Sequence, residues 1–496
     1  MSAIVDYHLP PPPEHRLETP EAAMDGHFAG SLTEDLRWEL KCWVILPVVA
    51  LGVAGLMAIL VALMRVPGAD AVLPWLGQTF FEKGLIAHVT FAFVIWYLGV
   101  QGALTVLATG QAGVLPQGSA FIGRVAVYAA GLSFVLILIP VLLNLGEPSA
   151  NNYIPVLIHP LFFAGLALLA FGLALPILRL MAQVAVQRSC EPVVFAIAAA
   201  GVIFLIALIC LGAAWFTMPE GTSATDAAER AFWGMGHIMQ FAHTLLLLAG
   251  FFLLSRMSLG ETPISNKLFK YMVGVFVAGA AIGPLLYLSY PAGDPAQVTA
   301  FTGLYWYVLP VPTAVVLLGV VWLFFRRALP LNEQTPEVIG LWVALILFGV
   351  GGVIGFFESS VDTRTPAHYH AELIGVTLVF MCLYFALFIP LLDRPMPARR
   401  WRKASYVLLG AGQLFHSMGL FVAGWDGVAR KVAGSEQGLD SATKLSSMIL
   451  MGLGGLIAVI GGVIFVVLAG RCLLPKAGPD ESNPDGVVAE PEPNQV

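Results

Sequence analysis

The chain has 496 residues, of which 58% are hydrophobic and only 11% are charged, and its mean hydropathy is +0.83. This composition excludes a soluble globular protein and predicts an integral membrane protein surrounded by lipid. The net charge of −6 is small for this length, and no nucleic-acid partner is predicted. The five cysteines form no CxxC pair, so isolated thiols are expected rather than a disulfide framework.

The two ends of the chain differ from the rest in composition. Residues 1–36 are polar and include "PPPEHRLETPE", and residues 475–496 are acidic and rich in proline. Both are predicted to be tails without a packed core, because such segments carry too little apolar surface to bury. Residues 37–474 are predicted to form the membrane domain.

Long apolar runs predict an all-α, polytopic bundle of about twelve transmembrane helices without a soluble domain. The expected spans are 39–65, 85–109, 120–144, 155–183, 192–217, 230–255, 267–290, 299–325, 336–357, 366–391, 402–425 and 446–472. Lysine and arginine gather in alternate connections, most densely in "DRPMPARRWRK" at 393–403. By the positive-inside rule both tails are cytoplasmic, and a bacterial inner membrane is the predicted location.

Seven histidines lie in or beside these spans: His88, His159, His237, His243, His368, His370 and His416. In the predicted orientation all seven fall in the outer half of the membrane. Ionisable groups inside a membrane are costly, so they indicate a functional site. Neutral imidazole is also a ligand for haem, copper and zinc.

Two of these histidines, His368 and His370, are one residue apart in "TPAHYH". Residues i and i+2 of a helix point roughly 200° apart, so one metal cannot easily bind both. Two cofactors, one on each side of the helix, could each take one ligand. Hydrogen bonds to neighbouring helices are the alternative explanation, but the five further histidines at this level favour cofactors.

Several local motifs accompany this pair: "LIAHVTFAFVIWYLG" in the second span, "FWGMGHIMQF" in the sixth, "VPTAVVLL" in the eighth, "DTRTPAHYH" before the tenth, and "GVARKV" in an outer loop. Together with the twelve spans, they resemble subunit I of the haem-copper oxidase superfamily, which includes cytochrome c oxidases and nitric oxide reductases. The resemblance covers nearly the whole chain.

The resemblance implies two haems. His88 and His370 would be the axial ligands of a low-spin haem, and His368 the single ligand of a high-spin haem. His237 would face the open side of the second haem as a ligand of a second metal, copper or non-haem iron. The basic pair Arg430 and Lys431 would meet the haem propionates.

The chain departs from the family pattern at the second metal. The family places two adjacent histidines after the seventh helix, whereas this chain has no histidine between residues 243 and 368, and Tyr287 and Leu288 occupy the corresponding place. His237 alone is a poor metal site. Tyr287 and Glu372 are the candidate catalytic residues.

The predicted function is that of a respiratory oxidoreductase that reduces dioxygen with electrons from a subunit II-like or cytochrome c partner. Nitric oxide reduction is a first alternative, since it needs only two electrons per turnover. A non-catalytic dihaem protein for electron transfer or gas sensing is a second. A twelve-helix transporter is a third, although it leaves the histidine layer unexplained.

Overall fold

A computed structural model describes residues 32–64, 78–113, 115, 117–187, 190–327, 334–359 and 361–474. Most of the predicted N-terminal tail and all of the predicted C-terminal tail lie outside these residues. The predicted membrane domain lies largely within them.

The described chain is almost entirely helical, and twelve of its helical segments are long and apolar enough to cross a membrane. Nine of these segments are single helices: α2 (Glu34–Met64), α6 (Ser119–Leu142), α7 (Pro160–Ala185), α8 (Pro192–Phe216), α9 (Ala224–Leu259), α10 (Asn266–Leu286), α13 (Pro336–Gly355), α16 (Arg399–Trp425) and α17 (Ala442–Leu473). The predicted all-α, twelve-span architecture is confirmed.

The other three spans are built from consecutive pieces. The second joins α4 (Gln78–Val89), a π-helical turn η2 (Thr90–Ile95) and α5 (Trp96–Gln111). The eighth joins α11 (Pro295–Tyr307) and α12 (Pro310–Arg326), with Pro310 opening the second piece. The tenth joins α14 (Arg364–Leu383), a π-helical turn η3 (Tyr384–Phe388) and α15 (Ile389–Leu391). Such π-helical turns often accompany functional sites.

Local sequence fixes where several helices begin. A serine or threonine side chain accepts a hydrogen bond from the backbone N–H three residues later at the first turn of α9, α10, α13 and α17; these residues are Ser223, Ser265, Thr335 and Ser441. This cap satisfies an N–H group that has no partner within the helix.

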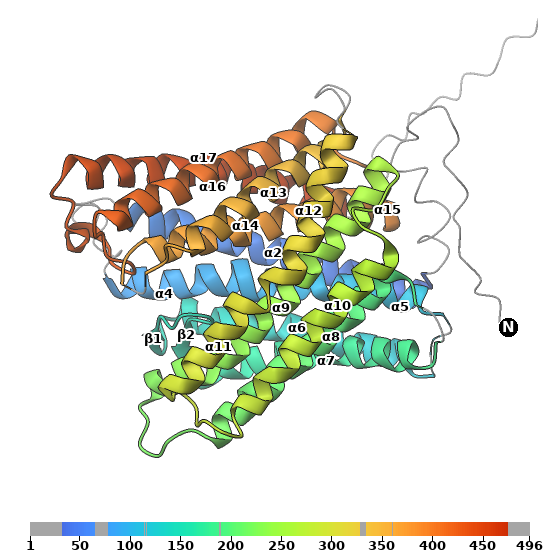
Figure 1. Ribbon diagram of the computed structural model, residues 1–496, viewed down its shortest axis with the longest axis horizontal. Helices are drawn as coiled ribbons and strands as arrows, with labels where there is room; N and C mark the ends of the chain where they lie inside the picture. Colours follow the sequence, from blue (N-terminus) through green and yellow to red (C-terminus); the bar gives the residue numbers. More distant parts are fainter. Residues whose placement is uncertain are drawn as a thin grey trace, which may run out of the picture.

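The two ends of the bundle are distinguishable (Figure 1). At one, on the left of the view, a short hairpin joins β1 (Glu147–Ser149) to β2 (Val156–Ile158), near the 3-10 turn η4 (Gly434–Gln437) and the start of α4. We call this the hairpin end. The opposite end, where α2 begins at Glu34 and α5 finishes at Gln111, is the tail end.

The most buried spans are the second, sixth and tenth, in which 89%, 94% and 83% of the most apolar window lies inside the protein. They also contact one another or shared neighbours: α14 packs on α9, α13 and α16, and α5 packs on α2, α7 and α8. The predicted haem and metal ligands His88, His237, His368 and His370 all lie on these three spans.

Close approach of α16 and α17 depends on small residues. A Cβ atom at Gly412 would lie 2.3 Å from the backbone nitrogen of Ala458, and one at Gly419 would lie 2.5 Å from that of Met451. Only glycine therefore permits this packing, as is common between membrane helices.

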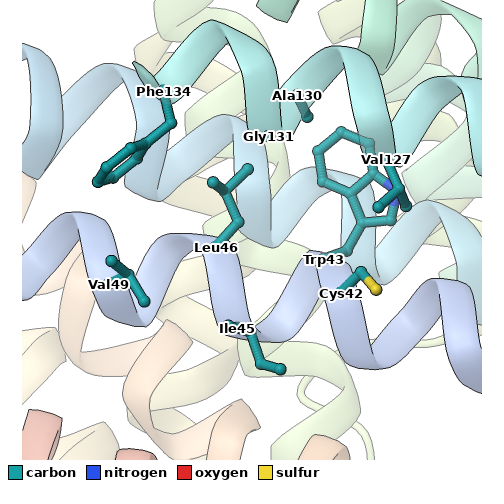
Figure 2. Close-up of a pocket in the computed structure, with 9 residues that line it drawn as sticks. All are labelled: Cys42, Trp43, Ile45, Leu46, Val49, Val127, Ala130, Gly131 and Phe134. Atoms are coloured by element: carbon teal, nitrogen blue, oxygen red, sulfur yellow. The ribbon is translucent and has the colours of Figure 1, made fainter. Parts of the chain in front are cut away.

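A groove of about 270 Å³ lies between α2 and α6 (Figure 2). Its lining is apolar apart from the Cys42 thiol and the Trp43 indole. Trp43 is eleven residues from Ala54, about 16 Å along α2, and Ala54 is the residue that contacts His88. The groove is therefore separate from the histidine layer.

Candidate functional site

The paired histidines of α14 are directed at different neighbours. His368 lies against α13, where its Nδ1 is 2.9 Å from the Gly351 carbonyl oxygen. The His370 ring lies against α16, with its centroid 4.7 Å from that of His416. The divergence expected from their spacing is therefore present in the fold.

His368 is buried, with 6% of its surface exposed, and both of its ring nitrogens are engaged. Because a carbonyl only accepts hydrogen bonds, Nδ1 carries the proton toward Gly351. Nε2 then accepts from the Tyr305 hydroxyl of α11 at 3.0 Å. A Glu372 carboxylate oxygen lies 3.6 Å from the same Nε2. The nitrogen expected to bind an iron thus faces a phenol and a carboxyl group.

His237 on α9 has the same arrangement. Its Nδ1 lies 2.9 Å from the Trp233 carbonyl oxygen, and its Nε2 lies 3.0 Å from the Tyr153 hydroxyl. The ring centroids of Tyr153, Trp233 and Phe301 are 4.8, 5.0 and 5.7 Å from that of His237. An aromatic enclosure therefore surrounds this imidazole, and Tyr153 supplies its only side-chain hydrogen bond in the described chain.

Tyr153 lies in the hairpin loop outside the membrane-spanning segments. Burial raises its pKa well above 10, and the negative charges of Glu358 and Glu229 act in the same direction. The phenol therefore keeps its proton at neutral pH, which lets it donate to His237.

The place of the family's histidine pair is occupied by residues that cannot replace it. Tyr287 is buried and packs on Phe301, 5.7 Å between ring centroids, while Leu288 is 83% exposed. Within the described ranges, no group of three or more His, Cys, Asp or Glu side chains is placed to hold a metal ion. The residues present do not fit copper or non-haem iron beside His237.

His88 is the last but one residue of α4, directly before the π-helical turn η2. Its Nδ1 lies 3.0 Å from the Ala54 carbonyl oxygen of α2. No described residue is bonded to its Nε2. A backbone carbonyl that orients one ring nitrogen is the usual support for an imidazole that binds a metal through the other.

His370 and His88 enter the bundle at a similar depth. They lie six and eight residues from the starts of their spans at Arg364 and Phe80, about 9 and 12 Å along the helices. The two rings contact different neighbours, Ala54 for His88 and His416 for His370.

His416 on α16 is a further histidine of this layer, beside His370. Its Nδ1 lies 3.0 Å from the Met451 carbonyl oxygen of α17, so this ring too is oriented by a backbone carbonyl. In the sequence, its place in this layer was indicated only by its position nine residues before the end of α16. The other two histidines have different roles: His159 caps α7 by accepting from Leu161, and His243 packs on Tyr97 and Phe93.

Arg430 and Lys431 lie in the loop after α16 and clamp the hairpin loop. Arg430 donates to the Asn152 side chain, and Lys431 donates to the Ala150 carbonyl. Burial lowers the pKa of Lys431 to about 8, with the Arg430 charge contributing. The basic pair predicted to meet propionates is thus engaged with Asn152 and Ala150, one and three residues before Tyr153.

Comparison with known proteins agrees with this architecture. Residues 40–464 match the family model described as cytochrome C and quinol oxidase polypeptide I. An uncharacterized protein of Rickettsia prowazekii (strain Madrid E) is 25% identical over 87% of this chain and 95% of the relative. An uncharacterized protein of Aquifex aeolicus (strain VF5) is 28% identical over 69% of this chain and 83% of the relative. A heme-copper terminal oxidase dimer solved by cryo-EM shares the fold, with a TM-score of 0.69 and 15% identity over 90% of this chain and 85% of that chain.

Proposed function

The chain belongs to the cytochrome c and quinol oxidase polypeptide I family, and from this membership we propose that it is a haem-binding respiratory oxidoreductase that passes electrons through a low-spin haem held by His88 and His370. The observation that carries the proposal is the anchoring of His88, whose Nδ1 faces the Ala54 carbonyl while Nε2 has no partner in the described chain. The arrangement of His88 and His370 therefore fits a haem.

Haem supplies a one-electron redox centre when it is bound, and two imidazole ligands suit electron transfer because the iron then needs no change of ligand. The protein's part is to hold the ring orientations. The Ala54 carbonyl fixes His88, and His370 packs against His416, which the Met451 carbonyl fixes in turn.

More specifically, we propose that dioxygen is reduced at a second haem bound by His368. It is supported by the Gly351 carbonyl, which orients Nδ1 as for a metal ligand. Tyr305 must leave Nε2 before this nitrogen can bind iron. The Tyr305 hydroxyl and the Glu372 carboxyl are then the nearest proton-holding groups, whereas Tyr287 lies beside Gly234, one turn before His237.

Nitric oxide reduction and non-catalytic electron transfer or gas sensing are the alternatives within the family. The aromatic enclosure of His237 favours the non-catalytic function, because it leaves no second metal site opposite His368. We further propose a subunit II-like or cytochrome c electron donor, a bacterial inner-membrane location and cytoplasmic tails. The arginine-rich start of α16 at the tail end supports this orientation.

The test is the haem content and spectrum of the purified protein from haem-replete cells. We expect a low-spin haem with the spectrum of two imidazole ligands, and carbon monoxide binding in the reduced state only if His368 also carries a haem. A preparation without haem would exclude all of these functions. One low-spin haem without carbon monoxide binding would support electron transfer alone.

A further inference from the structure

The groove between α2 and α6 lies on the lateral surface of the bundle (Figure 2). Val49, which lines it, is 48% exposed, whereas Trp43 beside it is 1% exposed. The Trp43 ring reaches the neighbouring α5, where a Cβ atom at Gly102 would lie 2.3 Å from it. One wall of the groove is therefore fixed by packing inside the bundle, while the open side faces the lipid around the spans.

Hydrocarbon is the filling that suits this groove. Water needs two to four polar partners in a cavity, and an empty groove would forfeit dispersion contacts. Cys42 and Val49 on α2, and Val127 and Phe134 on α6, mark its two ends and are seven residues apart, about 10 Å along each helix. The hydrocarbon of one leaflet is about 15 Å deep, so the groove matches much of the length of one acyl chain.

Two aromatic side chains lie on the tail-end side of the groove. Trp38 of α2 packs on Tyr128 of α6, with 6.1 Å between the ring centroids. The two residues are 38% and 68% exposed, and Trp38 lies one helical turn before Cys42. Exposed rings with an apolar body and a polar edge are typical of the membrane–water interface.

A pair of opposite charges lies farther toward the tail end. Arg124 of α6 and Asp35 of α2 form an ion pair of 3.1 Å, and their side chains are 60% and 54% exposed. Asp35 precedes Trp38 by three residues, and Arg124 precedes Val127 by three. An exposed pair of this kind contributes little to stability, so both groups are available to a ligand that offers the complementary charges.

From the tail end inward, the two helices thus present charges, then aromatic rings, then an apolar groove. A phospholipid has its headgroup, glycerol esters and acyl chains in the same order. We propose that the groove binds one acyl chain of phosphatidylethanolamine, whose phosphate contacts Arg124 and whose ammonium contacts Asp35. Guanidinium suits phosphate, and the primary ammonium donates hydrogen bonds that the quaternary ammonium of phosphatidylcholine lacks. This site lies outside the histidine layer and does not rest on the proposed function.

Native mass spectrometry of the full chain tests the headgroup contacts. The detergent-purified protein is titrated with phosphatidylethanolamine and with phosphatidylcholine of the same acyl chains. We expect phosphatidylethanolamine to bind about fivefold more tightly, since one hydrogen bond contributes about that factor. Asp35→Asn should remove this preference and leave phosphatidylcholine binding unchanged. Equal affinities in the wild type, or a preference that persists in Asp35→Asn, would overturn the headgroup assignment.

Filling the groove tests the place of the acyl chain. Gly131 lines the groove, and nothing lies within 4 Å of its Cβ position, so Gly131→Leu extends a side chain into open space. This variant should lose the preference for phosphatidylethanolamine. Gly274→Leu on α10 is the matched control, because its Cβ position is equally open and lies outside the groove; its preference should be unchanged. An unchanged preference in Gly131→Leu would overturn the groove as the site.

Cys42 provides a measurement without any substitution. Cys42 and Cys190 are both partly exposed thiols, and of the two only Cys42 lines the groove. In detergent, added phosphatidylethanolamine should slow the labelling of Cys42 by a lipid-soluble maleimide several-fold and leave the labelling of Cys190 unchanged. Labelling of Cys42 at the same rate with and without the lipid would show that the groove is not occupied by it.

Discussion

Two parts of the histidine layer, the His88 side and the side of His237 and His368, orient imidazole by the same means and differ in what contacts the remaining nitrogen. On the His88 side, a carbonyl fixes Nδ1 and no described residue is bonded to Nε2. On the other side, carbonyls fix Nδ1 of His237 and His368, but Tyr153 and Tyr305 donate to their Nε2 atoms. All three imidazoles are therefore oriented by a backbone carbonyl, but only at His88 is Nε2 without a partner among the described residues.

This difference separates two requirements of a haem or metal ligand. An imidazole must be held in place, and its lone pair must be accessible. At His88, Nδ1 is held and no described residue is bonded to Nε2, which supports its proposed role as an axial ligand. The His368 side meets the first and requires Tyr305 to move for the second.

Removal of His88 should have the largest effect. His88→Ala deletes an axial ligand, and we expect the low-spin haem signal to fall at least about tenfold, since loss of even an outer-sphere partner of a metal ligand costs 10- to 100-fold in affinity. Carbon monoxide binding by any haem on His368 should persist. The measurement is the haem-to-protein ratio with reduced spectra before and after carbon monoxide.

His159→Ala is the matched control for this variant. It removes an imidazole at the same end of the bundle whose contact is the cap of α7, so the low-spin signal should not change. If His88→Ala retained its low-spin signal, His88 would not be an axial ligand.

Release of His368 is the next largest effect. Tyr305→Phe removes the hydroxyl from Nε2 and keeps the ring. One hydrogen bond contributes about 0.5–1.5 kcal/mol, so the fraction of protein with carbon monoxide-binding haem should rise about two- to twelvefold. Tyr307→Phe, on the same helix but 80% exposed, should have no effect. No change in Tyr305→Phe would mean that the phenol does not limit haem binding at His368.

The architecture was predictable from sequence because apolar length alone selects membrane helices. All twelve expected spans are present, with ends displaced by at most seven residues; the largest shifts are at α4, which begins at Gln78 rather than at residue 85, and at α9, which begins at Ala224 rather than at residue 230. The added residues at the start of α9 include the charged Asp226 and Glu229, so hydropathy could not place them in a span.

The site was less predictable, because partners from distant segments decide it. The spacing of His368 and His370 was sufficient to predict that they diverge. Nothing in the sequence marked Tyr153, which reaches His237 from a hairpin loop 84 residues away. Tyr305 was one of several tyrosines near the membrane interface, and only packing selected it over the exposed Tyr307.

Crowding the His368 side should have a moderate effect. In Gly355→Ala the new Cβ would lie 2.9 Å from the His368 Nδ1, and that ring is held by Gly351, so neighbouring atoms must shift. Such overpacking typically costs about 1–3 kcal/mol of the free energy of unfolding.

Gly349→Ala is the matched control, because nothing lies within 4 Å of its Cβ position. Alanine there should stabilise α13 slightly. Chemical denaturation in mixed micelles measures both. Equal stabilities would show that His368 is loosely held, and the low-spin haem should be unaffected in either variant.

The smallest effect concerns the clamp on the hairpin loop that carries Tyr153. The pKa of Lys431 is about 8 in the folded protein, below its usual value near 10.5, chiefly because of burial. The unfolded state therefore binds more protons between these pH values, and the wild type should become more stable as pH rises through this range. Lys431→Met should lose this dependence. The difference should be about 1 kcal/mol or less, since the ammonium is partly exposed and screened. Unfolding midpoints of both proteins from pH 7 to pH 10.5 measure it; identical slopes would show that the Lys431 charge is not buried by the clamp. A change in the low-spin haem of this variant would contradict the separation of the two sides, because the Lys431 side chain donates to the loop that carries Tyr153.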